Sequence, residues 1–415
     1  MLWPMTFRPV FIAVVIASAL VVGAFLINRA RPRVETEQPA ASFVRATGKC
    51  AECHTRQQYS IVHEYEMSRH AQRGVNCLDC HQPADAQKGV EHHGFTIVTK
   101  LTAGNCRSCH APIYDEFLRS RHAAVSWAAV YGEQGLKPEQ VDFAEKYHPG
   151  YAKRPAHPLV GLEGPSAATS GCANCHSVGK PNDDGTIGTC TACHTRHTSS
   201  VAIARLPTTC GQCHLGPDHS QLEIYEESKH GVMFHAQERL LNLEAAPRSL
   251  TTRDMFVPTC ATCHMSGLNG QKVTHDPSDR LSYYLADAIT KPRPNKERAQ
   301  GEMKQICNQC HAKTLIDRVY TEAEKVVANT NQLVQQATDL MTTLRKENVL
   351  ATAPFSQPID FVYFDLWHYD GRTSKHGAFM GGSDFIQWNG NYPMLARTVE
   401  LRAQAEELRR RHGQR

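Results

Sequence analysis

One short motif, Cys-x-x-Cys-His, occurs eight times in this sequence. The copies are CAECH at 50–54, CLDCH at 77–81, CRSCH at 106–110, CANCH at 172–176, CTACH at 190–194, CGQCH at 210–214, CATCH at 260–264 and CNQCH at 307–311. They use all 16 cysteines, so none remains for a disulfide, a separate metal cluster or a nucleophile. Zinc ribbons also contain Cys-x-x-Cys pairs, but they do not need a histidine after every second cysteine.

The motif is the attachment signature of c-type haem, in which both cysteines form thioethers and the histidine is the proximal iron ligand. The sequence therefore predicts eight covalently bound haem c groups. The expected thioether residues are Cys50, Cys53, Cys77, Cys80, Cys106, Cys109, Cys172, Cys175, Cys190, Cys193, Cys210, Cys213, Cys260, Cys263, Cys307 and Cys310. The expected proximal ligands are His54, His81, His110, His176, His194, His214, His264 and His311.

The spacing of the motifs limits the fold. They lie between Cys50 and His311, about 33 residues for each, whereas an ordinary domain has roughly 100–200 residues. A chain this thin cannot enclose each porphyrin in its own protein core, and aromatic residues make up only 7% of the sequence. We therefore expect stacked haems to form much of the core.

The pattern of apolar residues predicts a mainly α fold. Residues 313–347 and the segment ARTVELRAQAEELRRRH near the C-terminus have apolar positions at helical spacing, and no run alternates convincingly like a strand. We expect short helices between the haems and a C-terminal cap of two long helices. A connection rich in proline and aromatic residues joins these two helices.

The N-terminal segment contains an uninterrupted apolar run at 11–27. Its length of about 17 residues is at the short limit for a membrane span. We expect an uncleaved transmembrane helix; the alternative is a cleaved signal peptide, with ASA at 17–19 as its cleavage motif. Arginines at 29, 31 and 33 follow the run and only Arg8 precedes it, which is the reverse of the positive-inside rule.

Haem attachment, which normally takes place outside the cytoplasmic membrane, decides the expected orientation. We expect the haem domain on the periplasmic side of the inner membrane, anchored by the N-terminal helix. The predicted organisation is a cytoplasmic N-terminus at 1–10, a transmembrane anchor at 11–27, a linker at 28–48, an octahaem cytochrome c domain at 49–315 and a C-terminal helical region at 316–415.

The remaining 15 of the 23 histidines are candidates for the distal position of each haem. Eight of them share small-residue or basic surroundings: His70, His93, His122, His197, His219, His230, His275 and His376. Eight distal ligands would make the protein an electron conduit, whereas seven would leave one haem open to a small ligand. We expect surface or supporting positions for His63, His92, His148, His157, His235, His368 and His412.

Several runs resemble the octahaem hydroxylamine oxidoreductase (HAO) family. They are CTACHTRHTSSVAIARLPTTCGQCHLGPDHSQLEIYEESKHG, then PTCATCHMSG and VTHD. The resemblance extends from about Cys50 to the C-terminus. It implies that the fourth haem, on Cys172, Cys175 and His176, is catalytic. It leaves His70, His93, His122, His197, His230, His275 and His376 as the distal ligands.

The resemblance also implies a pocket on that haem. Asp218 and His219 match an Asp-His pair after the sixth motif, and Tyr284 in THDPSDRLSYY matches a pocket tyrosine, with Tyr283 as the second choice. An imidazole beside a carboxylate, opposite a phenol, can transfer protons near neutral pH. The alternative is that His219 is an axial ligand, in which case His197 or another histidine is the spare one.

The direction of the reaction depends on a crosslink. Oxidative members of the family attach a C-terminal tyrosine of a neighbouring subunit to the catalytic porphyrin. Gln387 in QWNGNYPM stands at that position, although Tyr392 is an alternative placement. We therefore expect reduction of nitrite, hydroxylamine or both to ammonia, with hydroxylamine oxidation or a non-catalytic conduit as alternatives. A sulfur-oxyanion reductase is a weaker alternative. Octahaem enzymes of that class have a Cys-x-x-Cys-Lys motif, in which lysine replaces one proximal histidine, and this sequence has no such motif.

Expected partners follow from the location and the resemblance. A membrane position suggests a quinol-linked redox partner or a soluble cytochrome, and the resemblance implies a homotrimer. The formal net charge is only +4, and haem propionates would make the holoprotein acidic, so we expect no nucleic-acid partner.

Overall fold

The haem-attachment motifs fold as short helical turns, because a helix brings positions i, i+3 and i+4 onto one face. This places both cysteines and the histidine of a motif on the same side. In the computed structural model, which describes residues 15–23 and 43–414, three motifs form complete short helices: α5 (Cys77–His81), α11 (Cys172–His176) and α16 (Cys260–His264). The side chain of Asn76 accepts from two backbone amides at the start of α5, which helps to fix where that turn begins.

The chain divides into two units, Met1–Ser42 and Phe43–Arg415. In the first unit, residues 15–23 are helical and mostly exposed. The expected transmembrane helix at 11–27 lies only partly within the described residues, as does the linker at 28–48. Among the residues that the structure describes, no helix is both long and apolar enough to cross a membrane.

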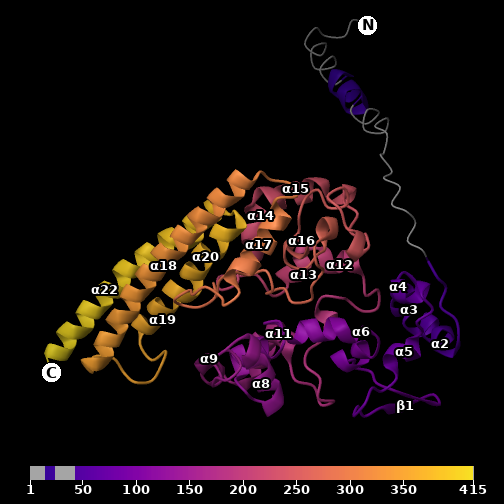
Figure 1. Ribbon diagram of the computed structural model, residues 1–415, viewed down its shortest axis with the longest axis horizontal. Coiled ribbons are helices and arrows are strands. Elements are labelled where there is room, and N and C mark those ends of the chain that lie inside the picture. The colour runs from indigo at the N-terminus through magenta and orange to yellow at the C-terminus, as the bar shows by residue number, and fades with distance from the viewer. Residues whose placement is uncertain (1–14, 24–42, 415) are drawn as a thin grey trace, which may run out of the picture. The chain divides into compact units, whose positions relative to one another are not determined.

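The second unit is mainly helical, as the sequence predicted (Figure 1). Its first half contains α2 (Lys49–Gln57), α3 (Tyr59–Glu66), α4 (Arg69–Gln72), α6 (Ala103–Leu118), α7 (Ala124–Tyr131), α8 (Pro138–Tyr147), α9 (Pro158–Glu163) and α10 (Pro165–Ser170). The middle contains α12 (Val201–Arg205), α13 (Pro207–Gly211), α14 (Gln221–Glu227), α15 (Lys229–Gln237) and α17 (Lys296–Cys307). Short 3-10 helices lie at Ser177–Gly179, Cys190–Ala192, Glu238–Leu240, Pro247–Ser249 and Leu268–Gly270.

One small hairpin interrupts the helices. Strands β1 (Val90–His92) and β2 (Phe95–Ile97) pair antiparallel, with Val90 opposite Ile97. His93 and Gly94 form the turn with positive φ angles of 50° and 87°, as two-residue hairpin turns require. His92 is therefore a strand residue and His93 a turn residue, although they are adjacent in sequence.

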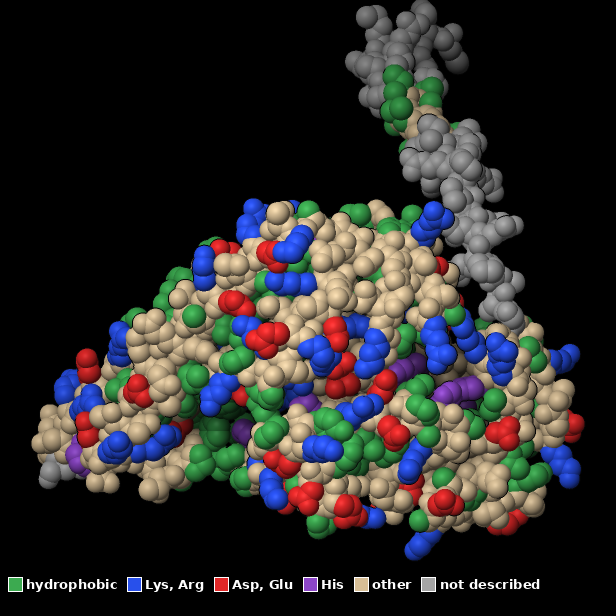
Figure 2. Space-filling view, viewed as in Figure 1, with side chains coloured by type: hydrophobic (Ala, Val, Ile, Leu, Met, Phe, Trp, Pro, Cys, Tyr) green, Lys and Arg blue, Asp and Glu red, His purple; other side chains and the backbone are tan. Residues whose placement is uncertain are grey.

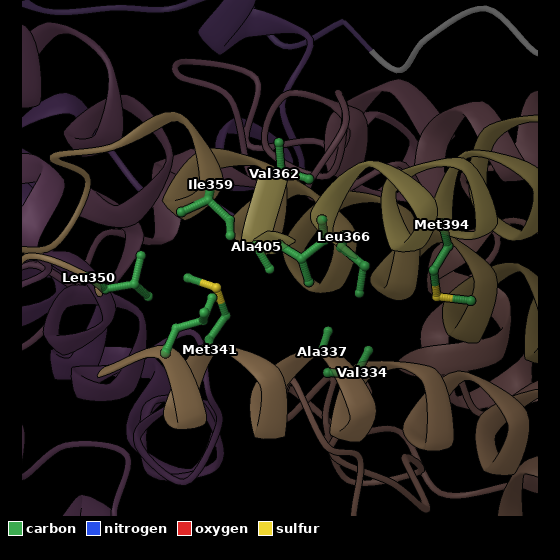
Figure 3. Packing of buried hydrophobic residues seen from close by; sticks show 11 residues of the cluster. Val334, Ala337, Met341, Leu350, Ile359, Val362, Leu366, Met394 and Ala405 are labelled. Carbon is green, nitrogen blue, oxygen red and sulfur yellow. The ribbon is translucent and has the colours of Figure 1, made fainter. Parts of the chain in front are cut away.

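The C-terminal region is built on α18 (Lys313–Lys346) and α22 (Tyr392–Gly413), which run side by side (Figure 1). The buried positions of α18 alternate in steps of four and three, as in a coiled-coil seam: Ile316, Tyr320, Ala323, Val327, Thr330, Val334, Ala337, Met341 and Leu344. Figure 3 shows how Val334, Ala337 and Met341 pack with residues of the following helices. The two long helices predicted from the sequence are confirmed.

The connection between the two long helices is itself mostly helical. It contains α19 (Pro358–Asp365), α20 (Gly371–Met380) and α21 (Ser383–Ile386), with π-helical turns η6 (Leu366–Asp370) and η7 (Gln387–Asn391). Helix α20 packs against both α18 and α14. Because α14 begins two residues after His219, the C-terminal cap reaches the segment that carries the expected pocket.

Candidate haem sites and reactive pocket

The cysteines fit thioether attachment. All 16 lie within the described residues and none forms a disulfide. Among the same residues, no group of three or more His, Cys, Asp or Glu side chains gathers as a metal-binding cluster. Figure 2 shows histidine side chains in hollows that cross the middle of one face.

Histidines from distant segments face one another in pairs. Two metal–imidazole bonds of about 2 Å place paired ring centroids roughly 6 Å apart. Five motif histidines each have a histidine from another segment at 5.7–6.3 Å: His54–His92 at 6.0 Å, His110–His70 at 6.2 Å, His81–His197 at 6.3 Å, His214–His122 at 5.7 Å and His311–His230 at 5.9 Å. These pairs fit bis-histidine haem iron.

The geometry assigns two further expected ligands less directly. His275 lies close enough to His194 to lower the pKa of that imidazole, although burial is the larger cause. His376 has no ring partner of this kind among the described residues, but its Nδ1 is hydrogen-bonded to the backbone oxygen of Arg372, 2.9 Å away. It remains an expected distal ligand from the sequence.

Polar contacts orient the paired histidines. His81 Nδ1 lies 2.8 Å from the Val98 oxygen, and His176 Nδ1 lies 2.6 Å from the Ser126 oxygen. The backbone N–H of His197 donates to Glu64, and that of His275 donates to Glu116, at 3.0 and 2.9 Å. The two ring contacts, of His81 and His176, fix the orientation of the imidazole and raise its basicity as a ligand, whereas the two backbone contacts anchor the segments that carry His197 and His275.

At the first haem, the structure favours a different histidine from the one chosen from the sequence. His92 on β1 faces His54, whereas His93 packs edge-on against His92 at 4.7 Å. The physical reason is the hairpin, since only the strand residue is directed at the motif. We therefore take His92 as the distal candidate in place of His93.

This reassignment predicts different results for adjacent substitutions. His92→Ala should convert one low-spin haem to high spin, because the distal position would lose its imidazole. His93→Ala should leave the spin states unchanged. Electron paramagnetic resonance of both ferric variants checks this, and a new high-spin signal only in His93→Ala would restore the original assignment.

The structure brings Asp218 and His219 together beside the fourth motif. His219 Nδ1 lies 2.8 Å from Asp218 Oδ2, and its ring centroid lies 6.5 Å from that of His176. The His219 ring is also 6.0 Å from that of His214, which already faces His122. The ring of His219 thus lies between two motif histidines, with Nδ1 occupied by a carboxylate.

Asp218 has a second histidine neighbour, which the sequence interpretation placed among surface or supporting residues. His368 Nε2 lies 3.6 Å from Asp218 Oδ2, and its side chain is only 14% exposed. Burial alone would raise the pKa of Asp218, but the hydrogen bond from His219 and the proximity of His368 outweigh it and hold that pKa far below its usual range. The carboxylate is therefore ionised.

Tyr284 lies in an adjoining group of buried side chains. It is 8% exposed, its ring stacks on Tyr151 at 5.1 Å, and the guanidinium groups of Arg121 and Arg293 lie 5.7 and 5.6 Å from its ring centroid. Among the described residues, its hydroxyl makes no hydrogen bond to Asp218 or His219. The hydroxyl of Tyr151 in turn donates a hydrogen bond to the Asp287 carboxylate.

Tyr283, the second choice, has a different environment. Its hydroxyl donates to Glu324 of α18 at 2.7 Å, and its ring packs on Phe379. These contacts tie it to the C-terminal helices and turn it away from the tyrosine pair. The structure thus favours Tyr284 over Tyr283 as the pocket residue.

Arg372 of α20 connects the two groups. Its Nη1 donates to His368 Nε2 at 2.9 Å, and its Nε donates to the backbone oxygen of Ala286, two residues after Tyr284, at 2.8 Å. Lys375 is fully buried and donates to the Asp287 oxygen at 2.6 Å, and burial lowers its pKa to about 7. The charge of Arg372 gives the region a positive field that suits an anionic ligand.

The sequence interpretation missed Arg372 and Lys375, and it listed His368 among surface or supporting residues without placing it beside Asp218. A usable signal was present in WHYDGRTSKH, because His368, Arg372 and His376 recur every four residues and so face one way on a helix. Nothing local, however, indicated that this face meets Asp218, which lies 150 residues earlier.

Comparison with known proteins places the chain in a family. The family model described as "Seven times multi-haem cytochrome CxxCH" matches residues 73–358, which include seven of the eight motifs. The chain belongs to this multihaem cytochrome family. The motif at 50–54 lies ahead of the matched region.

Relatives of this multihaem cytochrome confirm the resemblance to HAO-like proteins. A probable nitrite reductase-hydroxylamine oxidoreductase fusion protein of Kuenenia stuttgartiensis is 25% identical over 396 residues, which cover 84% of this chain and 43% of the relative. The chain thus spans less than half the length of that relative.

Two solved structures share the fold of this multihaem cytochrome. A hypothetical multiheme protein matches with a TM-score of 0.76 at 19% identity, covering 90% of this chain and 98% of its own. The reducing HAO-like protein complex of Kuenenia stuttgartiensis matches with a TM-score of 0.66 at 20% identity, covering 88% and 85%.

Proposed function

We propose that this multihaem cytochrome reduces nitrite, hydroxylamine or both to ammonia at the haem attached to Cys172, Cys175 and His176. The observation that carries this proposal is the Asp218–His219 pair beside His176, with its 2.8 Å contact. The haem would supply electrons and a binding position for the nitrogen atom. Cleavage of an N–O bond also consumes protons, which the pair is suited to deliver.

The proposed roles of the chain's own residues follow from their contacts. Asp218 holds the proton of His219 on Nδ1, so that Nε2 faces the other way and can exchange a proton with substrate. The buried hydroxyl of Tyr284 is the second proposed donor. Arg121 and Arg372 favour an anion near these groups and shield the carboxylates of the region from one another.

We further propose that all eight motifs carry haem c, including the motif at 50–54 that precedes the family match. We propose seven distal ligands, with His92 in the place first given to His93: His70, His92, His122, His197, His230, His275 and His376. The ring separations from the motif histidines support five of them, and the contact of His376 Nδ1 with the Arg372 oxygen supports His376.

The proposed direction rests on residue 387. Gln387 begins the π-helical turn η7, where a crosslinking tyrosine of an oxidative enzyme would stand. Without that crosslink the reactive haem would be an ordinary haem c, which favours reduction. Hydroxylamine oxidation remains the second candidate, because Tyr392 is 59% exposed and could reach a neighbouring subunit.

Association with further copies of this chain is part of the proposal. Trp388, Tyr392, Leu395 and Val399 follow one another in steps of four, three and four, and are 68%, 59%, 54% and 67% exposed. This apolar stripe lies on the side of α22 away from its buried residues and supports a homo-oligomer, for which we propose a trimer. The redox partner we propose is quinol-linked or a soluble cytochrome on the periplasmic side of the membrane.

Paired assays test the proposed direction. We expect the purified holoprotein to form ammonia from nitrite or hydroxylamine with a chemically reduced dye, and to oxidise hydroxylamine slowly with an oxidised acceptor. A long-wavelength band of a crosslinked haem together with fast oxidation would reverse the assignment. Absence of both reactions would favour a conduit with eight distal ligands.

A further inference from the structure

Asp218 lies between two histidines that come from different parts of the chain. His219 is its sequence neighbour, whereas His368 reaches it from the π-helical turn η6 in the C-terminal cap. Single π-helical turns inside helices are frequent at functional sites. The ring of His368 is also held in place, because it stacks on Phe364 with centroids 4.2 Å apart.

The proton on His368 can be placed from its neighbour. A guanidinium group has only donors, so Nε2 of His368 must accept the 2.9 Å hydrogen bond from Arg372. The proton of the neutral ring is then on Nδ1, which is buried and has no hydrogen-bond partner among the described protein groups. Burial also lowers the pKa of His368 to about 4, in agreement with a neutral ring.

A neutral His368 whose Nε2 is already an acceptor has no proton there to offer Asp218. The 3.6 Å contact between His368 Nε2 and Asp218 Oδ2 is therefore a van der Waals and electrostatic contact and not a hydrogen bond. The histidine that donates a hydrogen bond to the Asp218 carboxylate is His219, whose Nδ1 lies 2.8 Å from Oδ2. The guanidinium of Arg372 lies at the same Nε2 edge of the His368 ring, and its positive charge favours the ionised carboxylate of Asp218.

We propose that His368 and Arg372 form a positioning pair, which holds the Asp218 carboxylate against Nδ1 of His219 and so fixes the direction in which His219 transfers its proton. This inference rests on the proposed function of the Asp218–His219 pair. It assigns the C-terminal cap a role in the pocket, since Arg372 also anchors the segment after Tyr284 through the Ala286 oxygen. His368 acts through Asp218 and touches no substrate.

His368→Phe is the sharpest test, because phenylalanine keeps the stacking on Phe364 and removes Nε2. Arg372 is less suitable, since its side chain also donates to the Ala286 oxygen and a substitution would remove both contacts. We expect His368→Phe to keep its haem content and its KM and to lose kcat on the order of tenfold, part of the ~10²–10⁴ that acid–base groups contribute. In an Asp218→Asn background the same change should cost nothing more, because the two act as one unit.

A second readout does not depend on turnover. The stretching frequency of carbon monoxide bound to the reduced protein reports the field in the pocket, and His368→Phe should shift it in the same direction as Asp218→Asn. His157→Phe is the matched control, because His157 also lies beside Phe364, at 6.2 Å, without contacting Asp218. His368→Gln, which can still accept from Arg372, should stay near wild type.

Two results would overturn the inference. One is a double variant, His368→Phe with Asp218→Asn, in which the two losses of kcat multiply. The other is a carbon monoxide band that His368→Phe leaves unchanged while Asp218→Asn moves it. If the wild-type protein reduces neither nitrite nor hydroxylamine, the proposed function fails, and the carbon monoxide band alone still decides whether His368 acts on Asp218.

Discussion

Asp218→Asn is expected to lower the kcat of nitrite or hydroxylamine reduction by about 10²–10⁴-fold, the usual contribution of a general acid–base group. The asparagine keeps the shape of the side chain but removes the charge that holds the proton on Nδ1 of His219. Haem content, spin states and substrate binding should be unchanged. Steady-state kinetics with a reduced dye, together with optical spectra, measures all four quantities.

A surface pair provides the control for this substitution. His235 of α15 is hydrogen-bonded to Glu226 in a similar histidine–carboxylate contact, away from the fourth motif. Glu226→Gln should therefore leave kcat within about twofold, as surface changes usually cost little. A wild-type rate in Asp218→Asn would move catalysis to another haem or out of this chain.

Tyr284→Phe should lower kcat by about 10²-fold or more, because it removes the second proposed proton donor. The stacking on Tyr151 should persist, since a phenyl ring preserves the contact. The adjacent Tyr283→Phe is the matched control, and its loss of the hydrogen bond to Glu324 should affect stability rather than kcat. Equal rate losses in the two variants would show that Tyr284 has no special role.

The haem motifs and the long helices could be predicted from the sequence because they depend on local spacing. The interval from Cys172 to His176 defines an attachment site wherever it occurs, and the steps of four and three along α18 define a buried seam. The Asp218–His219 pair was identified by resemblance, and its contact is local because the two residues are adjacent. These features need no knowledge of distant contacts.

Other features depend on contacts between distant segments or on backbone detail. The choice between His92 and His93 follows from the hairpin turn at His93 and Gly94, which no motif in the sequence indicated. The approach of His368 to Asp218 requires that the cap pack on α14, and the helical connection between α18 and α22 contains π-helical turns that interrupt the apolar periodicity. Tyr284 was identified by resemblance, and only its buried neighbours distinguish it from Tyr283.

The spin state of the ferric haems in wild type and in His219→Ala tests the central claim most directly. We predict one high-spin haem among the low-spin ones in the wild type, on the motif of His176, and the same count in His219→Ala, because His219 serves the pocket and does not bind iron. Electron paramagnetic resonance with spin quantitation gives both counts. A fully low-spin wild type that gains a high-spin haem in His219→Ala would contradict the account and identify His219 as an axial ligand.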